Sequence, residues 1–500
     1  MTATTRPTLV RAALLTIVVT MAGSLLGLVR DLLLARFFGA DGGTDAFLVA
    51  WTVPETAFVL VVEGAMSLLM IPVFSRALSR RRAASDVVAA TLPPVLVVLV
   101  TLSAATALGA PVLVRVLAPG LADPALAVTC TRLTSITVLT FGIAGYLSAA
   151  LRAGNVFGAP AAIHLAYNAG IVGLMWTLHG RLGVVSAAAG VALGSLFMVL
   201  VQAPSFLRHV GLPRHWRSPA TVMTLGAVAP IVIYTLSRQA QVFVERFLGS
   251  SLAPGTISYL NYAQKVAQIP MLVALLVCTV TFPSLARSVA AGETERARRR
   301  VETDLRTVTA LILVAAAYLT AFAPQIVAVL LQHGRFTAGD TAATAAILRV
   351  YALGILGHAL VGVLSRPFFT GERRTWYPAV AMAAGLAATA VLAVAGVPWL
   401  GAYAIAAANG IGITLTAALL FLGLRRHIIA VSVTAVGVST ARLAAAAACA
   451  GAAGWIAARA MAAWPALPTA VAGGLLVLGV FVLAARLAGI EELRRFPHVR

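Results

Sequence analysis

Charged residues are scarce in this chain of 500 residues, because Asp, Glu, Lys and Arg together make up only 11% of it. A soluble domain is typically about a quarter charged, whereas here 60% of the residues are hydrophobic and the mean hydropathy is +0.96. This composition excludes a water-soluble globular protein. The net charge of +21 lies in short loops between apolar segments, so it indicates membrane topology rather than nucleic-acid binding.

Cysteines and catalytic motifs are scarce as well. The three cysteines, Cys130, Cys278 and Cys449, are far apart inside apolar segments, which predicts core positions and neither a disulfide framework nor a metal site. The sequence has no P-loop, no HExxH motif and no hydrophilic loop long enough to fold a catalytic domain. We therefore expect a protein that is not an enzyme and binds no cofactor.

Apolar segments long enough to span a membrane recur from end to end. A hydrocarbon core about 30 Å thick requires about 20 apolar residues in a helix. The predicted spans lie at residues 10–30, 46–74, 87–109, 127–150, 159–178, 183–205, 220–246, 257–285, 307–331, 342–369, 377–396, 400–424, 436–458 and 466–488. We predict an all-α polytopic membrane protein of about fourteen transmembrane helices, the first of them uncleaved.

Arginines are distributed unevenly among the loops. Alternate loops carry clusters such as residues 80–82 and 298–300, and the loops between them carry single arginines such as Arg36 and Arg335. Cytoplasmic loops are the ones enriched in Lys and Arg. This pattern predicts a protein of the cytoplasmic membrane with both termini in the cytoplasm.

The chain also repeats itself at an offset of 211 to 218 residues. Pro72 corresponds to Pro283, and Gly183 corresponds to Gly401. Repeats with the same orientation are a transporter architecture, with the pathway at the seam between the halves. We predict two parallel six-helix repeats that form two lobes, followed by two further helices. The predicted boundaries are residues 1–210 for the first lobe, 211–428 for the second, and 429–500 for the last two helices and a cytoplasmic tail.

Ionisable residues occur inside the predicted spans of both lobes. Each costs roughly 2.5–3.5 kcal/mol on insertion scales, so it normally faces a partner or a water-filled cavity. The candidates are Arg30, Asp31, Asp45, Glu55, Glu63, Arg238, Glu245 and Lys265, the only lysine of the chain. Glu55 and Glu63 are eight residues apart, which places them on roughly one face of an α-helix.

A cavity lined by Arg and Lys suits an anionic cargo such as a phosphate or diphosphate, because these side chains donate charge-assisted hydrogen bonds to its oxygens. The alternative is that the charges form internal ion pairs, such as Arg30 with Asp31 or Arg238 with Glu245. We favour a hydrophilic cavity, since the set occurs in both halves.

Several motifs resemble a known family. They are GLVRDLLLARFFGADGGTDAFLVAW at residues 27–51, VEGA at 62–65, ISYLNYAQKVAQIP at 257–270, TFPSLARS at 281–288 and HGRFTAGDT at 333–341. With these motifs the chain, from about residue 8 to 425, resembles the MurJ/MviN family, the lipid II flippases of the MOP superfamily. The resemblance implies a V-shaped pair of lobes that alternate access and flip an undecaprenyl-diphosphate-linked peptidoglycan precursor outward. It also implies a groove for the lipid tail on the last two helices, and cavity positions for Arg30, Asp31, Asp45 and Glu63.

The chain departs from the family pattern at several cationic positions. Ser24 replaces an arginine, and Phe58 and Val59 replace an Arg-Arg pair. Lys265 replaces a further arginine, which keeps the charge and loses the bidentate geometry.

Two other functions stay open at this point. One is export of a different cargo, either another lipid-linked oligosaccharide or a drug exchanged for a cation. The other is a non-transporting scaffold in a cell-wall assembly complex. For a transporter, we expect an ion gradient, the membrane potential or consumption of the cargo as the energy source, and cell-wall synthesis proteins as partners.

Overall fold

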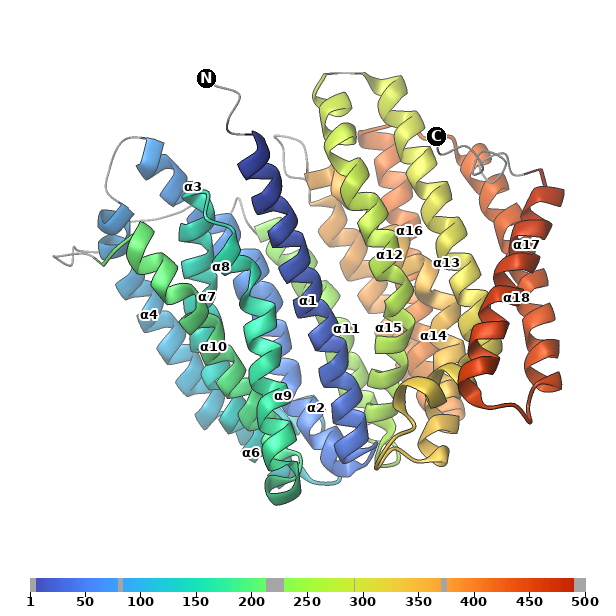
Figure 1. Cartoon of the computed structure of the whole chain (residues 1–500), viewed down its shortest axis with the longest axis horizontal. Coiled ribbons are helices and arrows are strands. Elements are labelled where there is room, and N and C mark those ends of the chain that lie inside the picture. The colour runs from blue at the N-terminus through green and yellow to red at the C-terminus, as the bar shows by residue number, and fades with distance from the viewer. Residues whose placement is uncertain (1–5, 80–83, 213–228, 292, 370–375, 490–500) are drawn as a thin grey trace. The chain divides into compact units, whose positions relative to one another are not determined.

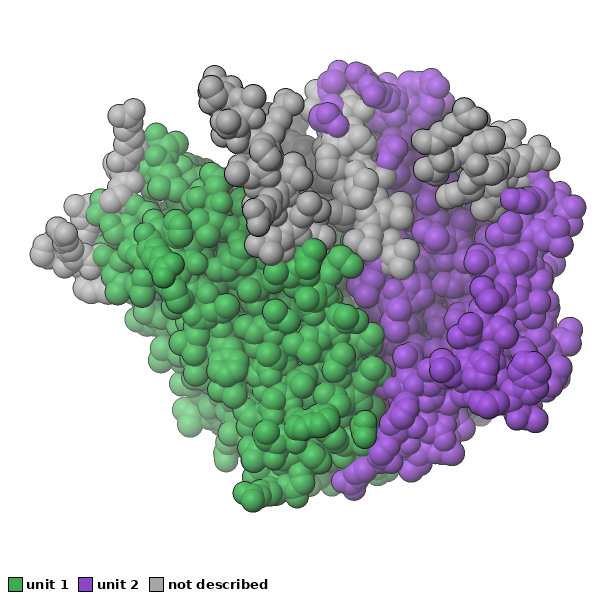
Figure 2. Space-filling view, in the orientation of Figure 1, with its two compact units in different colours: residues 1–257 green, residues 258–500 purple. Residues whose placement is uncertain are grey.

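The computed structural model describes residues 6–79, 84–212, 229–291, 293–369 and 376–489, and the regular elements in these ranges are all helices (Figure 1). This confirms the all-helical prediction. The chain divides into two compact units, residues 1–257 and 258–500, which Figure 2 colours separately. The predicted lobe boundaries at residues 210 and 428 follow the sequence repeat rather than compactness, and they stay predictions.

Unit 1 begins with one long helix and then a second helix in three parts. These are α1 (Arg6–Phe38), α2 (Gly42–Ala57), the π-helix η1 (Phe58–Ala65) and α3 (Met66–Ser79). Asp41 starts α2, because its side chain accepts a hydrogen bond from the Thr44 backbone N–H. The predicted span 46–74 therefore runs through α2, η1 and α3.

The rest of unit 1 is built around α7. The elements are α4 (Ala84–Leu108), α5 (Ala110–Leu117), α6 (Pro124–Thr134), α7 (Ile136–Ala153), α8 (Gly158–Ala161), α9 (Ile163–Leu182), α10 (Val185–His209) and α11 (Ala229–Gly249). Helix α7 contacts α3, α4, α10 and η1, and Tyr146 at its centre packs against Phe74 and Val88. Helix α11 contacts α2, α5 and η1, which is why it belongs to this unit.

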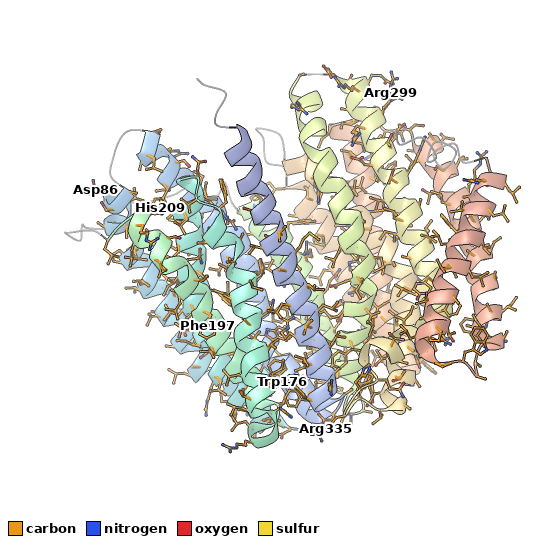
Figure 3. All side chains as sticks on the ribbon, in the orientation of Figure 1. Asp86, Trp176, Phe197, His209, Arg299 and Arg335 are labelled. Atoms are coloured by element: carbon orange, nitrogen blue, oxygen red, sulfur yellow. The ribbon has the colours of Figure 1, made fainter. Side chains whose placement is uncertain are left out.

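Unit 2 is organised around α13. Its elements are α12 (Thr256–Ala290), α13 (Thr294–Leu331), α14 (Ala338–Leu364), the 3₁₀ turn η3 (Arg366–Phe369), α15 (Tyr377–Leu400), α16 (Ala402–His427), α17 (Val433–Ala460) and α18 (Ala466–Leu487). Helix α13 contacts α14, α17 and α18. The Tyr318 hydroxyl of α13 donates to the Ala470 carbonyl of α18 at 2.9 Å, which ties the last helix to the unit. In Figure 3, Arg299 and Arg335 mark the two opposite ends of this unit.

Eleven helices in the described part of the chain are long and apolar enough to cross a membrane. The other three predicted spans fall on α9, α11 and α12, which are helices as well. Helix α11 carries Arg238, Glu245 and Arg246, and α9 carries His164, Asn168 and His179. These polar side chains lower the mean hydropathy of both helices, which are therefore not among the eleven. In α12, many of the side chains from residue 273 onward lie outside the described part. A multi-pass membrane protein is established, and the count of fourteen stays a prediction.

Two helix pairs, one in each unit, cross at close distance on glycines. In α9 and α10, a Cβ atom at Gly194 would overlap the carbonyl oxygen of Tyr167. In α15 and α16, a Cβ atom at Gly412 would overlap the carbonyl oxygen of Gly385. Small residues at such crossings let helix backbones approach closely in a membrane.

The turns within these two pairs also share a backbone conformation that L-residues with side chains rarely adopt. Gly183 ends α9 with φ +55°, and Gly401 ends α15 with φ +53°. Glycine tolerates a positive φ because it has no Cβ atom.

Of the cysteines, Cys130 is buried as predicted, whereas Cys449 is exposed, since it lies on a face of α17 that other helices leave uncovered.

Candidate functional site

A hydrogen-bonded network surrounds Arg30 in unit 1. Its Nε and Nη2 atoms donate to Oδ1 of Asp31 at 2.9 and 2.8 Å, and Nη1 donates to Oδ1 of Asn168 at 2.9 Å. The Arg30 and Asp31 side chains are only 12% and 11% exposed. All three guanidinium nitrogens thus have an acceptor, and the Arg30–Asp31 ion pair considered in the sequence analysis is present.

Aromatic residues cover the guanidinium. The Cζ atom of Arg30 lies 4.3 Å from the ring centroid of Trp51, within the range of a cation–π interaction. The indole Nε1 of Trp51 donates in turn to the hydroxyl of Tyr167 at 3.2 Å. The network therefore joins α1, α2 and α9 around one cation.

Asn168 holds α9 against α1 at this point. Its Nδ2 atom donates to the backbone carbonyls of Gly23 and His164, both at 3.0 Å. The absence of a side chain at Gly23 is required, because a Cβ atom there would lie 2.8 Å from the Cβ of His164. The amide of Asn168 can serve two helices because it carries both an acceptor and two donors.

The network contains one cation, Arg30, and two acidic side chains, Asp31 and Glu55. Asp31 compensates the charge of Arg30, and Glu55 of α2 lies near enough to interact electrostatically with Arg30 and Tyr167. Glu55 is half-buried. Arg30 is therefore a paired cation rather than an isolated one, which is how an arginine is tolerated at membrane depth.

The π-helix η1 follows this network along the chain. It begins at Phe58, whose backbone N–H contacts the carbonyls of Pro54 and Glu55. Phe58 packs edge-on against Phe141 with ring centroids 5.3 Å apart, so this residue makes an apolar contact where the family resemblance would place an arginine. Wide π-helical turns are frequent at functional sites.

The π-helix lies between Glu55 and Glu63. The expectation that these two residues share a helix face assumed a regular α-helical repeat, and it stays a prediction because part of the segment between them is π-helical. Glu63 lies in η1, and its side chain is outside the described part of the structure.

Two further candidate acids are buried in unit 1. Asp45 at the start of α2 is 4% exposed, and its Oδ2 accepts a 2.7 Å hydrogen bond from the Gly255 backbone N–H in the turn after α11. Glu245 in α11 is 1% exposed. A buried carboxylate is costly unless it is hydrogen-bonded or paired, and the Gly255 N–H supplies such a hydrogen bond to Asp45.

The remaining two candidates are cations. Arg238 in α11 is exposed, and it forms no ion pair with any described residue, so the alternative Arg238–Glu245 pair is not formed. Lys265 belongs to α12 of unit 2, where it is half-buried and engaged by neighbouring groups. The structure thus brings Arg30, Asp31 and Glu55 together, and the joint role of all eight candidates stays a prediction.

The sequence reasoning missed three residues of the network: Trp51, Tyr167 and Asn168. Asn168 had a signal, since it is a polar amide in the middle of the predicted span 159–178. Trp51 closes a motif that was noted for its resemblance to a family. Nothing in the sequence indicated that α9 would bring Tyr167 to this indole.

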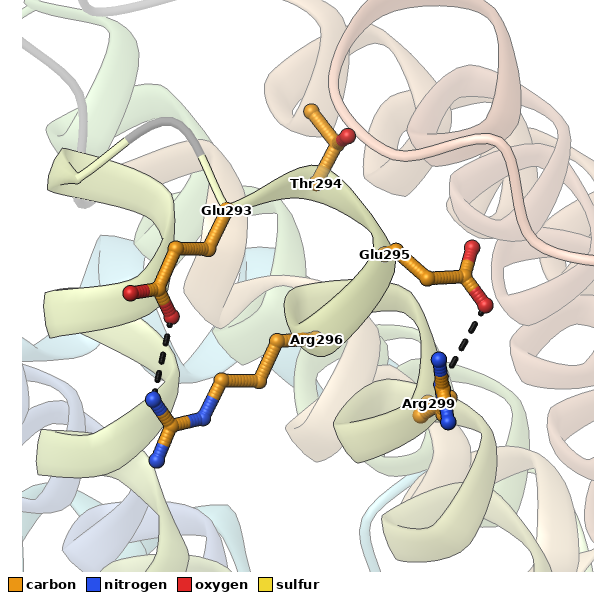
Figure 4. Close-up of a pocket in the computed structure, with 5 residues that line it drawn as sticks. All are labelled: Glu293, Thr294, Glu295, Arg296 and Arg299. Atoms are coloured by element: carbon orange, nitrogen blue, oxygen red, sulfur yellow. Dashed lines mark hydrogen bonds and ion pairs between the residues drawn. The ribbon is translucent and has the colours of Figure 1, made fainter.

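A surface hollow at the start of α13 is a separate feature (Figure 4). It is lined by Glu293, Thr294, Glu295, Arg296 and Arg299. Arg296 pairs with Glu293 and Arg299 pairs with Glu295, both at 3.2 Å, and all four side chains are well exposed. Exposed pairs of this kind contribute little to stability, so we interpret the hollow as a solvated surface.

Comparison with known proteins agrees with the motifs. The sequence model of the family described as lipid II flippase MurJ matches residues 34–469 of this chain. The lipid II flippase MurJ of Burkholderia cenocepacia is 27% identical over 424 residues, which cover 82% of each chain. The probable lipid II flippase MurJ of Vibrio cholerae is 27% identical over 444 residues, which cover 83% of each chain.

Solved structures establish the fold. A lipid II flippase MurJ in an inward closed conformation matches with a TM-score of 0.79 at 18% identity, over 96% of this chain and 100% of that chain. An inward-facing multidrug resistance MATE family transporter of the MOP superfamily matches with a TM-score of 0.69 at 15% identity, over 83% of this chain and 97% of that chain. The family match spans most of the sequence, so the expected resemblance is confirmed. The chain is a multi-pass membrane transporter rather than an enzyme, and it belongs to the lipid II flippase MurJ family of peptidoglycan biosynthesis.

Proposed function

We propose that this protein translocates a polyprenyl-diphosphate-linked cell-wall precursor, lipid II, from the cytoplasmic to the outer leaflet by alternating access. Membership of the family supports this cargo. The observation within the chain that carries the proposal is the Arg30 network, because it holds a guanidinium at membrane depth with one nitrogen bonded to the neutral amide of Asn168, a partner that an anionic cargo oxygen would replace.

The chemistry of the network suits a diphosphate. A phosphate oxygen is a stronger acceptor for a guanidinium than the neutral amide oxygen of Asn168. Exchange of Asn168 for a cargo oxygen would keep Arg30 paired throughout transport. The other candidates, Asp45, Glu63, Arg238, Glu245 and Lys265, are proposed as further cavity residues.

We propose fourteen transmembrane helices arranged as two parallel six-helix repeats and a C-terminal pair. The two glycine crossings support the repeat, because Tyr167 and Gly385, Gly183 and Gly401, and Gly194 and Gly412 all correspond at one offset of 218 residues. The order of packing supports it too, since α9 with α10 and α15 with α16 form equivalent hairpins. Arginine-rich loops support a cytoplasmic position for both termini in the cytoplasmic membrane.

Transport of this cargo also needs an energy source, and the sequence has no P-loop that would bind a nucleotide. We propose coupling to an ion gradient or to the membrane potential, or consumption of the cargo by cell-wall synthesis proteins on the outer side. The buried carboxylates of Asp45 and Glu245 are the groups in unit 1 that could bind a proton or cation.

Complementation of a bacterium depleted of its essential lipid II flippase tests the proposal. We expect the unaltered chain to restore growth. Arg30→Ala should abolish the rescue and Arg30→Lys should weaken it, whereas Arg36→Ala, an exposed arginine on the same helix, should leave it intact. Lys265→Ala should impair rescue and Lys265→Arg should not, because arginine retains the charge.

Membrane levels of each variant, measured by immunoblotting, separate lost transport from lost folding. If the unaltered chain reaches the membrane at normal levels and fails to restore growth, the cargo assignment is wrong. Transport of a drug or a scaffold role would then replace it.

A further inference from the structure

Two arginines converge on one tryptophan in unit 2. Trp455 lies in the last turns of α17, and the Cζ atom of Arg349, from α14, is 4.4 Å from its ring centroid. The Cζ atom of Arg459, one turn further along α17, is 5.4 Å from the same ring. The two guanidinium groups are therefore less than about 10 Å apart, comparable to the Debye length at 0.1 M salt.

This pair of cations has no counter-ion in the described part of the chain. Arg349 donates from Nε to the Thr320 backbone carbonyl at 3.2 Å, and neither arginine forms an ion pair with a described carboxylate. Asp340, near the start of α14, is occupied elsewhere. Its oxygens accept from the Tyr259 hydroxyl and from Thr337. Two positive charges therefore lie near one ring, and no described carboxylate neutralises either of them.

Trp455 and Arg459 lie in the last turns of α17, at the end of unit 2 where the chain turns back into α18. Exposed tryptophans mark this end of unit 2, since Trp399 at the end of α15 is 86% exposed and Trp464 in the turn after α17 is 58% exposed. Successive spanning helices alternate in direction, so the end of α15 and the end of α17 lie on the same side of the membrane. Tryptophan is enriched at the membrane–water interface.

We propose that Arg349, Arg459 and Trp455 bind the phosphate of an anionic bilayer phospholipid in the leaflet at this end of unit 2. Guanidinium groups match phosphate oxygens in charge and geometry, and the Trp455 ring lies within cation–π range of both of them. This site involves none of the residues of the Arg30 network, so it is independent of the proposed cargo. It would anchor α17 and α14 to the headgroup layer.

Native mass spectrometry of the purified full-length protein tests the site with three probes. They are phosphatidylglycerol, diacylglycerol with the same acyl chains and no phosphate, and inorganic phosphate as a competitor. We expect retention of phosphatidylglycerol and not of diacylglycerol. The variant with Arg349→Gln and Arg459→Gln should bind phosphatidylglycerol at least about a hundredfold more weakly, since a hydrogen bond to a charged group is lost at each position.

Arg335→Gln is the matched control for each single substitution, because Arg335 is an exposed arginine at the same end of unit 2 and its loss removes one positive charge, as Arg349→Gln or Arg459→Gln does alone. Its affinity for phosphatidylglycerol should be unchanged. The pair Arg349→Lys and Arg459→Lys keeps the charge and should retain part of the binding even if the glutamine variant folds poorly. Equal losses in the double glutamine variant and in Arg335→Gln would overturn the proposal. So would retention of inorganic phosphate without phosphatidylglycerol, since the site would then take a free anion.

Discussion

The contact between Arg30 and Asn168 is the one that links α1 to α9 through a charge, and Asn168→Leu removes it while keeping the number and branching of the side-chain heavy atoms. The substitution deletes the 2.9 Å bond from Arg30 Nη1 and the 3.0 Å bond to the Gly23 carbonyl. Arg30 keeps its ion pair with Asp31, and the Gly23 carbonyl remains part of the α1 backbone. The loss is therefore mainly that of one charge-assisted hydrogen bond.

Two magnitudes bracket its size. A hydrogen bond to a charged group contributes about 1.5–3 kcal/mol in soluble proteins. Polar contacts between membrane helices average only about 0.6 kcal/mol, with a maximum near 1.7. Because Arg30 is charged and largely shielded from solvent, we expect the upper part of the membrane range. The predicted coupling between Arg30 and Asn168 is about 1–1.5 kcal/mol.

A double-mutant cycle measures this coupling directly. The free energy of unfolding in mixed micelles would be measured for Asn168→Leu, Arg30→Met, the double variant and the unaltered protein. The cycle subtracts the cost of leaving Asp31 without its cation, because that cost occurs in both Arg30 variants. A parallel cycle with Arg36→Met, an exposed position, should give no coupling. A coupling energy below about 0.3 kcal/mol for Arg30 and Asn168 lies within ordinary additivity error and would refute the role given to this contact.

Two further predictions concern the repeat and the topology. Gly194→Ala and Gly412→Ala should each lower the free energy of unfolding by roughly 1–3 kcal/mol through overpacking. Gly173→Ala, where a Cβ atom meets open space, should be neutral or slightly stabilising, and a harmless Gly412→Ala would contradict the equivalence of the two crossings. A reporter active only outside the cytoplasm should be inactive when fused after Arg300 and active after Gly339, and the opposite result would reverse the proposed orientation.

Much of the fold was predictable because membrane helices obey a length rule that depends on composition alone. Each predicted span overlaps one or more helices in the described part of the chain, and the glycines Gly183 and Gly401, which correspond in the sequence repeat, share a positive φ. The charged candidates were visible for the same reason, since an ionisable residue in an apolar segment stands out without any knowledge of its neighbours.

The side chains that contact these residues could not be predicted from the sequence, because they come from helices far apart in the chain. Arg30 meets Asn168 across 138 residues, and Trp51 meets Tyr167 across 116. The π-helix at Phe58–Ala65 was also invisible, since hydropathy does not distinguish a wide helical turn from a regular one. The sequence by itself determined which residues enter the membrane. Only helix packing decided that Asn168 and Trp51 complete the surroundings of the Arg30 guanidinium, because these contacts depend on side-chain geometry across α1, α2 and α9.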